Sequence, residues 1–599
     1  MKKRLTSAIS VVIILTMMIT MLTSCGGGNK SEANTIHTVT YQEPGSLDPA
    51  LSRGTHESLI LNHLFTGLLS YNSKGDLSPG MAELPDVSED GLTYTFHLKD
   101  DMKWSNGDPV TANDFKYEWL RVLTPETGAE YSYQFYYIQG AEELNTLEAP
   151  GTYYVKDSNG KDTKEIDHKV EYTDSDTEGL NIEGKSKEEI SKMVYDKWLS
   201  EKKEKVAIEA PDDKTLVVKL NNPVPYFAEL TANYAFYPIN SKIAKKNPDW
   251  AKSASDDYTC NGAFTLENWD HDNCITLAKN DSWVDAKDVK IDGIIFDILE
   301  DHNTAWQNYE SGQYQFLSGA PQEVVAEKTK DNDKELHFGG ELGTYYYALN
   351  MESGDNDKAI FSNKKIRQAL SMSLDRDAIV KNVAKGGQYP ATGLVCYGIK
   401  DDQGKDFRDP EDNLLKYEPK KAKELLKEGL KEEGLKLSDM NDAVLMYNTD
   451  ENHKKLAQTL QQMWKQNLGI EIALENCDLN VKMDREDNHD FDISRAGWVG
   501  DYNDPMTFMD ISVTDGPMNF SGYSNAEYDS LIETAKTAND QTERMNAMKK
   551  AERILMDDMP LIPLYFYTQP YFVKPNVKGI YKPLTSQPIL TYAIIEDDK

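Results

Sequence analysis

The chain has 599 residues and a formal net charge of −35, with 100 acidic against 65 basic residues. Affinity for nucleic acid depends on neutralised phosphates, so this charge argues against a nucleic-acid partner. The length exceeds what one hydrophobic core supports. It predicts several domains, in which the 39% of hydrophobic residues can form packed cores.

The N-terminus has the pattern of an export signal. Basic residues at positions 2–4 precede an apolar run over residues 8–22. The run leads into Leu22-Thr23-Ser24-Cys25, which resembles the lipobox of bacterial lipoproteins, whose cysteine is lipidated. We therefore expect a lipoprotein signal peptide over residues 1–24 and a lipid-anchored linker over residues 25–34. An uncleaved membrane helix is the alternative.

Strand and helix patterns alternate through the first half of the chain. Residues 36–40 and 93–98 have the period-2 pattern of strands, and residues 56–64 are expected to form a helix. A capping box at residues 111–114 opens a helix with one apolar face. The polar segment 150–205 is interpreted as an insertion. Further strands are predicted at residues 215–220, 262–269, 274–278 and 293–299.

The second half continues this alternation. Residues 342–350 form an apolar strand that we expect to cross between lobes, and Ser362 or Asn363 caps a following helix. Another helix begins near His453, and a strand is expected after it at residues 469–474.

One stretch of this second half suggests a binding site. Residues 491–498 alternate as a strand, and Gly497 has no side chain, so another backbone can approach there. Arg495 lies within the strand, and Asp501 follows it. A strand edge with opposite charges nearby suits a free peptide, whose ammonium, carboxylate and amides need these partners.

Signals for metal binding or catalysis are weak. His56 and His63 fall on one helical face near Glu57, but no matching further ligand accompanies them, so we expect no metal site. The sequence contains neither Gly-x-Ser-x-Gly nor His-Glu-x-x-His. Asp501 and Asp504 could form a carboxylate pair, which leaves a secreted hydrolase as an alternative.

Several segments together resemble a known family, the peptide/nickel class (family 5) of bacterial extracellular solute-binding proteins that serve ABC importers. The chain is most similar to its oligopeptide-binding members, on the basis of His453-Lys454-Lys455-Leu456, Arg485 and the two segments Arg495–Trp498 and Asp501–Asn503 in this order. The matching segments are Trp104-Ser105-Asn106-Gly107, Thr111-Ala112-Asn113-Asp114, Ile366–Leu370, Leu374–Arg376, Arg495-Ala496-Gly497-Trp498, Asp501-Tyr502-Asn503 and Met559–Tyr565.

The resemblance implies an α/β, bilobed periplasmic-binding-protein fold of type II, in its large class with an extra subdomain and with hinge strands between the lobes. Ligand would lie between the lobes and be enclosed by hinge closure. We expect the lobe I core in residues 35–55, 208–342 and 569–599. The extra subdomain of lobe I is expected in residues 56–207, with the insertion at about 150–205, and lobe II in residues 343–568.

The resemblance also implies roles for individual residues. Asp501 is expected to bind the ammonium of a peptide. The peptide carboxylate is expected to meet three cations, Arg495, Arg485 and His453. The strand edge and its flanking contacts are expected from Gly497, Trp498, Tyr346, Tyr131 and Glu43.

The implied function is capture of oligopeptides for the membrane subunits of an ABC permease, without catalysis and without a cofactor or metal. We expect a monomer outside the cytoplasm, anchored to the membrane through lipid on Cys25. The same fold could instead bind a dipeptide, a signalling peptide, haem or a nickel chelate.

Overall fold

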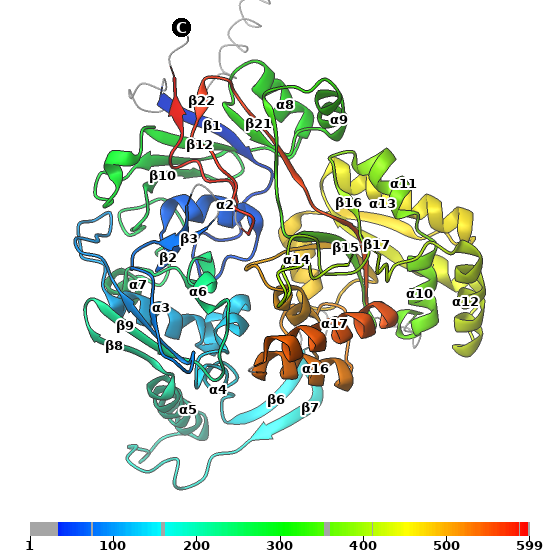
Figure 1. Cartoon of the computed structure of the whole chain (residues 1–599). Helices are drawn as coiled ribbons and strands as arrows, with labels where there is room; N and C mark the ends of the chain where they lie inside the picture. The colour runs from blue at the N-terminus through cyan, green and yellow to red at the C-terminus, as the bar shows by residue number, and fades with distance from the viewer. Residues whose placement is uncertain are drawn as a thin grey trace, which may run out of the picture.

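The structure is a computed structural model that describes residues 34–72, 76–156, 162–352, 360–409, 411–538, 540–585 and 587–596. These residues form two α/β lobes that face each other (Figure 1). The predicted signal peptide and Cys25 lie outside the described residues. Within the described ranges, no helix is long and apolar enough to cross a bilayer.

The first lobe contains a four-stranded sheet in the order β1-β12-β11-β10. Its strands are β1 (Thr35–Thr40), β12 (Gly293–Ile298), β11 (Cys274–Lys279) and β10 (Phe264–Asp270). Helix α2 (Thr55–Leu64) contacts β10 and buries its apolar side chains. These elements confirm the predicted strands and helix to within two residues.

His63 of α2 is a buried, neutral histidine. Its Nδ1 donates to the Leu59 carbonyl at 2.7 Å, and its Nε2 accepts from the backbone N–H of Leu590 at 2.9 Å. Burial lowers the pKa of His63 to about 4. Both ring nitrogens are therefore occupied by the fold itself, and the described residues contain no group of three side chains that could hold a metal ion.

A second sheet of the first lobe has the order β4-β5-β9-β8. Its strands are β4 (Asp86–Val87), β5 (Thr93–His97), β9 (Thr215–Lys219) and β8 (Ile208–Asp212). Helix α3 (Ala112–Val122) packs against β8 and β9, and its predicted capping box between Thr111 and Asp114 is present.

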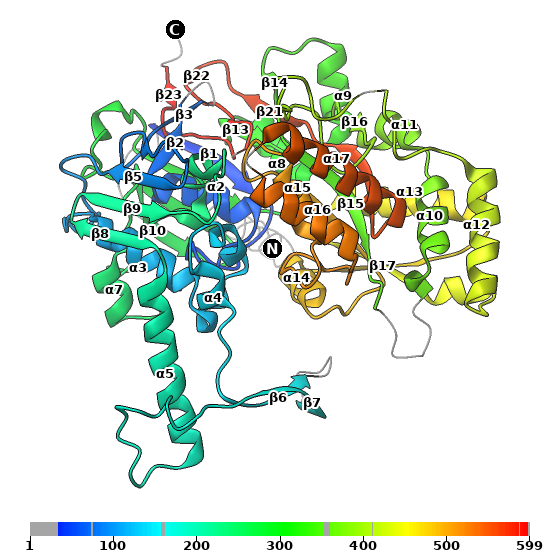
Figure 2. The same ribbon diagram turned by 60° about the horizontal axis from the view of Figure 1, so that its bottom comes forward.

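The segment expected as an insertion projects from this sheet (Figure 2). It comprises β6 (Gly151–Lys156), β7 (Asp162–Val170) and α5 (Lys187–Lys205). Because β5 pairs with β9, the second sheet takes strands from both sides of residue 207, so the boundary expected there does not separate two sheets. The polar composition of this segment marks the insertion and not the end of a structural unit.

The second lobe is built on a six-stranded sheet in the order β16-β20-β15-β19-β17-β18. Its strands are β16 (Tyr389–Pro390), β20 (Leu561–Phe566), β15 (Gly343–Leu349), β19 (Ile493–Val499), β17 (Val444–Asn448) and β18 (Ala473–Cys477). The longer helices of this lobe are α10 (Lys364–Met372), α12 (Pro419–Glu432), α13 (Glu451–Asn467), α14 (Leu479–Asp487), α16 (Ala526–Thr537) and α17 (Gln541–Asp558).

Strand β18 differs from its prediction. The expected strand at residues 469–474 alternates in burial, with Ile470 and Ile472 inside, but pairing with β17 begins only at Ala473. The period-2 pattern therefore reports alternating burial here, and not the residues that pair in the sheet.

Two short connections join the lobes. A three-stranded sheet, β13-β21-β14, comprises β13 (Phe316–Ser318), β21 (Gln569–Val573) and β14 (Leu336–Gly339). β14 leads directly into β15, and β20 leads directly into β21 (Figure 1). β15 itself lies within the sheet of the second lobe, so the lobe crossing expected of this strand is made by the residues just before it. The antiparallel pairing of β15 with β20 places both connections side by side.

The remaining elements are short. They are β2 (Leu69–Tyr71), β3 (Leu77–Pro79), β22 (Val577–Lys578), β23 (Ile594–Ile595), α4 (Ala141–Asn145), α6 (Phe227–Leu230), α7 (Ser241–Lys246), α8 (His302–Glu310), α9 (Gln322–Lys330), α11 (Arg376–Ile379) and α15 (Met506–Met509). Two 3₁₀ helices, at Glu130–Phe135 and Tyr234–Phe236, lie on the first lobe.

A buried ion pair fixes the loop that follows β19. Arg544 of α17 binds both carboxylate oxygens of Asp504, at 2.6 and 2.7 Å, and both side chains are at least 92% buried. The Arg544 guanidinium also lies 5.3 Å from the ring of Tyr226, which belongs to the first lobe.

We expect Arg544→Met to lower the free energy of unfolding by about 3–5 kcal/mol, because it leaves the Asp504 carboxylate buried without a counter-ion. Chemical denaturation of both proteins measures this. The double variant Arg544→Met/Asp504→Asn should recover much of the loss, and equal stability of the single and double variants would contradict the explanation.

A second ion pair joins the lobes directly. His302 Nε2 lies 2.6 Å from Asp450 Oδ2, and His302 Nδ1 makes a short hydrogen bond to the Gly319 carbonyl. Both ring nitrogens face acceptors, an arrangement that favours the doubly protonated imidazole. Burial opposes this charge, but the hydrogen bond and charge of Asp450 outweigh burial and raise the pKa of His302.

The raised pKa gives a pH-dependent contribution to stability. It is fully present below the unfolded value of 6.5 and is lost as pH rises through the raised pKa. We expect His302→Gln to lower the free energy of unfolding by about 1.5–3 kcal/mol at pH 6, the range for hydrogen bonds to charged groups, and by less at high pH. Denaturation at pH 6 and pH 9 tests this, and an equal loss at both would contradict it.

Candidate functional site

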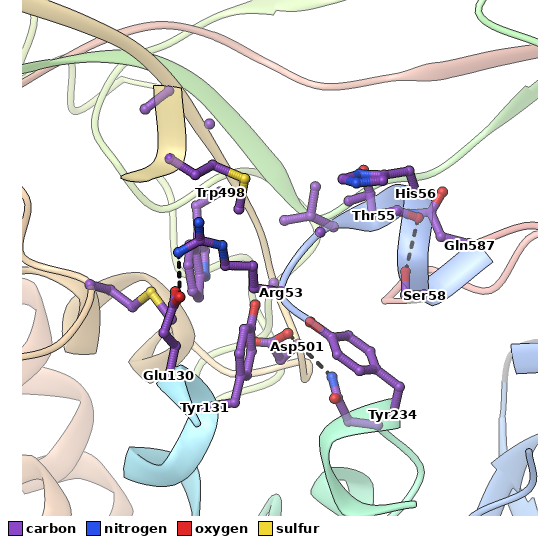
Figure 3. Close-up of a pocket in the computed structure, with 18 of the residues that line it drawn as sticks. Arg53, Thr55, His56, Ser58, Glu130, Tyr131, Tyr234, Trp498, Asp501 and Gln587 are labelled. Carbon is purple, nitrogen blue, oxygen red and sulfur yellow. Dashed lines mark hydrogen bonds and ion pairs between the residues drawn. The ribbon is translucent and has the colours of Figure 1, made fainter. Parts of the chain in front are cut away.

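A cavity of about 420 Å³ lies between the lobes. The first lobe contributes residues near Arg53, Tyr131 and Tyr234, and the second contributes the end of β19 (Figure 3). The strand residues that line the cavity are Arg495, Ala496, Gly497, Trp498 and Val499, followed by Gly500 and Asp501. The volume is within the range of ligand-binding clefts.

Strand β19 presents an open backbone edge to this cavity. It pairs with β15 along its whole length, but its pairing with β17 ends at Ser494. The N–H of Gly500 donates to the Leu342 carbonyl on the β15 side. Since antiparallel strands alternate, the N–H and C=O groups of Gly497 and Val499 point away from β15. They can pair with an extended ligand.

Gly497 has a close neighbour within the protein. A Cβ atom there would lie 2.3 Å from the hydroxyl oxygen of Tyr567, which directly follows β20. This neighbour is a side chain, and the approach of a second backbone at Gly497 stays a prediction. The glycine lets the Tyr567 hydroxyl reach Arg495, whose Nη2 donates to it at 3.4 Å.

Asp501 is a buried carboxylate held by neutral groups. Its side chain accepts from Gln134 Nε2 at 2.8 Å and from Asn233 Nδ2 at 3.2 Å. No basic side chain of the described residues lies within ion-pair distance of it. Burial raises the pKa of Asp501 to about 7, although both amide donors favour the charged form.

Arg495 is the complementary case, a partly buried cation that has no carboxylate partner among the described residues. Its guanidinium lies 4.6 Å from the ring of Tyr345, and its Nε–H is buried without an acceptor in the described part of the chain. A guanidinium stays charged at any physiological pH, so this group can bind a planar anion such as a carboxylate.

The other charged residues that line the cavity are neutralised within the protein. Arg53 pairs with Glu130 and with Asp487, and the Arg53–Glu130 contact appears in Figure 3. Lys482 pairs with Glu486 at 2.6 Å. Glu341 lies 4.0 Å from Lys582. Among the described residues that line the cavity, Asp501 and Arg495 are therefore the two charged groups without an ion-pair partner in the protein.

Aromatic rings form the walls between these two charges. Tyr131 stacks on Trp498, with ring centroids 6.4 Å apart and planes at 12°, and it also contacts Tyr234 (Figure 3). Tyr346, from β15, lines the cavity as well. Such rings offer apolar contact to varied side chains.

The structure brings together six of the nine predicted ligand-binding residues. The residues that line the cavity are Asp501, Arg495, Gly497, Trp498, Tyr346 and Tyr131. Glu43, Arg485 and His453 are not among the lining residues.

Glu43 and Arg485 have partners elsewhere in the protein. Glu43 accepts from Trp269 and His271 and thereby fixes the β10–β11 turn. Arg485 pairs with Glu475 and Asp490 outside the cavity.

His453 does not supply the cation expected of it. Burial and the nearby Arg495 guanidinium lower the pKa of His453 to about 3, so its imidazole is neutral near pH 7. Its Nδ1 makes a 3.2 Å hydrogen bond with the Tyr345 hydroxyl. His453 therefore supports the tyrosine beneath Arg495, and Arg495 is left as the cation for an anionic ligand group.

Some site residues have no signal in the sequence. Gln134 and Asn233 hold Asp501 from 367 and 268 residues away along the chain. Arg53 and Tyr567 also reach the cavity from distant segments. A polar residue outside a regular strand or long helix is ordinarily predicted to be exposed at the surface. Only the three-dimensional structure shows that these residues contact the site.

Known proteins resemble this chain in sequence and in fold. The family described as "Bacterial extracellular solute-binding proteins, family 5 Middle" matches residues 76–520. The oligopeptide-binding protein OppA of Bacillus subtilis is 37% identical over 601 residues, covering 98% of each chain. Two solved structures are also similar. One is an oligopeptide ABC transporter substrate-binding domain from Bacillus anthracis (TM-score 0.79, 29% identity, 95% of this chain and 99% of that one).

The second similar solved structure is that of Listeria monocytogenes OppA bound to peptide (TM-score 0.77, 29% identity, 94% of this chain and 99% of that one). These likenesses confirm the predicted fold class, the mixed α/β fold of periplasmic binding proteins. They also identify a family of binding proteins that are not enzymes. The chain belongs to the bacterial extracellular solute-binding proteins of family 5.

Proposed function

We propose that the chain is the oligopeptide receptor of an ABC importer. A peptide lies extended between the lobes, with its ammonium at Asp501 and its carboxylate at Arg495. Its backbone amides pair with the open edge of β19 at Gly497 and Val499. The receptor then delivers the peptide to the membrane subunits of the permease.

One observation carries the proposal: the two charges of the described lining without an ion-pair partner have opposite signs and stand at opposite ends of an open strand edge. Asp501 and Arg495 are separated by six residues, or up to about 20 Å at roughly 3.3 Å per residue. A short zwitterionic peptide complements both charges and the edge between them. Backbone hydrogen bonds are the same for every peptide sequence, so this recognition tolerates varied side chains.

The proposal also places the receptor outside the cytoplasm, held to the membrane by lipid on Cys25. The lipobox-like Leu22-Thr23-Ser24-Cys25 and the polar residues after it support this. Mass spectrometry of the protein from bacterial membranes should find an acylated Cys25 as the first residue. Cys25→Ala should abolish both acylation and retention in the membrane fraction.

Native mass spectrometry of the purified protein, followed by calorimetry, tests the binding function. We expect short peptides to co-purify intact, and we expect both N-acetylation and C-amidation to weaken rebinding. A haem or a metal chelate as the co-purified ligand would overturn the proposal, as would equal affinity for free and doubly blocked peptides.

A further inference from the structure

The carboxylate of Asp501 belongs to the second lobe, but the groups that hold it belong to the first. Gln134 and Asn233 donate to its two oxygens, one each. Within its own lobe, the backbone N–H of Asp501 donates to Thr507 Oγ1 at 3.1 Å. That bond fixes the backbone and leaves the carboxylate free to turn. The orientation of the carboxylate therefore depends on contact between the lobes.

Within the first lobe, the side chain of Gln134 meets that of its neighbour Tyr133, but this contact satisfies only part of the amide. The Gln134 side chain is almost fully buried, and its Oε1 has no hydrogen-bond partner among the described residues. A buried amide oxygen without a donor is unfavourable, so burial of this glutamine is not explained by the stability of its own lobe. The contact across the interface explains it.

In this arrangement of the lobes, the Asp501 carboxylate is buried and accepts from two neutral donors, but it meets no cation of the described residues. A peptide ammonium bound there adds the missing positive charge. The attraction between the ammonium and the carboxylate is strongest when the carboxylate is oriented and shielded from water. A ligand shifts an equilibrium towards the state that it binds better, so the ammonium favours the closed state.

On the basis of the proposed function, we infer that Gln134 and Asn233 are positioning residues that couple recognition of the peptide ammonium to closure of the lobes. Backbone contacts along β19 and the carboxylate contact at Arg495 can form with the second lobe alone. The ammonium contact is different, because its full strength requires side chains of both lobes.

Gln134→Leu is the main test, because leucine fills a similar volume and removes the donor together with the unpartnered oxygen. Gln139→Leu is the matched control, since Gln139 Nε2 donates at 3.1 Å to the Leu220 carbonyl within the first lobe. Asn233→Ser is a second variant. Asn233 Oδ1 also accepts from the N–H of Ala235, and serine can keep this cap while it loses the reach to Asp501.

Calorimetry with tri-alanine and N-acetyl-tri-alanine gives the first readout. We expect the wild type and Gln139→Leu to prefer the free amine at least tenfold. In Gln134→Leu and Asn233→Ser this preference should shrink at least threefold, through weaker binding of the free peptide. Equal losses for both peptides would indicate a merely structural role and overturn the inference. If the wild type binds neither peptide, the proposed function itself fails.

Small-angle scattering gives the second readout, the compactness of the full chain. The wild type should contract when saturated with tri-alanine, and it should contract less with the acetylated peptide or in Gln134→Leu. Equal contraction with both peptides in the wild type would overturn the coupling to closure while leaving peptide binding intact.

Discussion

Asp501→Asn should weaken peptide binding at least tenfold and at the same time stabilise the ligand-free protein near pH 8. The first effect follows from the loss of the partner for the peptide ammonium, because an enclosed charge without its partner is unfavourable by about 2–5 kcal/mol. The second follows from the cavity itself, which buries the Asp501 carboxylate with neutral donors only.

The sign of the stability effect comes from the pKa. Burial raises the pKa of Asp501 from 3.8 to about 7, so the folded protein holds a proton that the unfolded chain releases in this window. Stability therefore falls as pH rises from about 4 to 7. The shift of about three pH units corresponds to about 4 kcal/mol as an upper bound. Asparagine does not titrate, so the free energy of unfolding of the variant does not fall with pH through this group.

Calorimetry with a free peptide measures the first effect, and denaturation of ligand-free protein at pH 5 and pH 8 measures the second. Asp490→Asn is the control, because Asp490 is an exposed carboxylate of the same lobe outside the cavity lining. Unchanged affinity would remove Asp501 from the site. A variant that is less stable than the wild type at pH 8 would mean that the carboxylate has a cationic partner in the free protein.

The elements that the sequence predicts well are those specified by neighbouring residues. The capping box of Thr111 and Asp114 starts α3 because both partners lie within one helical turn. The alternation before Trp498 predicts β19 because one face of the strand is buried. Asp501 could be proposed as a site residue for a similar reason, since it lies two residues after the strand that contains Arg495.

Contacts between distant segments could not be predicted in this way. The sequence around His453 shows a histidine at a helix start, but its neutrality comes from burial beside Arg495. The limit of the sheet β4-β5-β9-β8 is set by the pairing of β5 with β9, which no local pattern encodes. The donors to Asp501 likewise come from irregular segments that become neighbours only when the lobes meet.

Arg495→Met should reduce affinity for a free peptide by about 30-fold or more and should abolish the preference for a free carboxylate over a carboxamide. Methionine fills much of the same space, so the change chiefly removes the charge. A lost partner for an enclosed carboxylate is worth at least about 2 kcal/mol, which is about 30-fold in affinity. The free protein should lose little stability, because Arg495 has no carboxylate partner among the described residues.

Arg495→Lys separates charge from geometry. Lysine keeps the positive charge but cannot lie flat on Tyr345 and bind a carboxylate with two parallel hydrogen bonds, so its affinity should fall between those of the wild type and Arg495→Met. Arg485→Met is the control, because the ion pairs of Arg485 lie outside the cavity. If Arg495→Met still preferred the free carboxylate, another cation would have to bind it. Lys482 is the first candidate, since it lines the same cavity and could exchange its bond with Glu486 for the ligand.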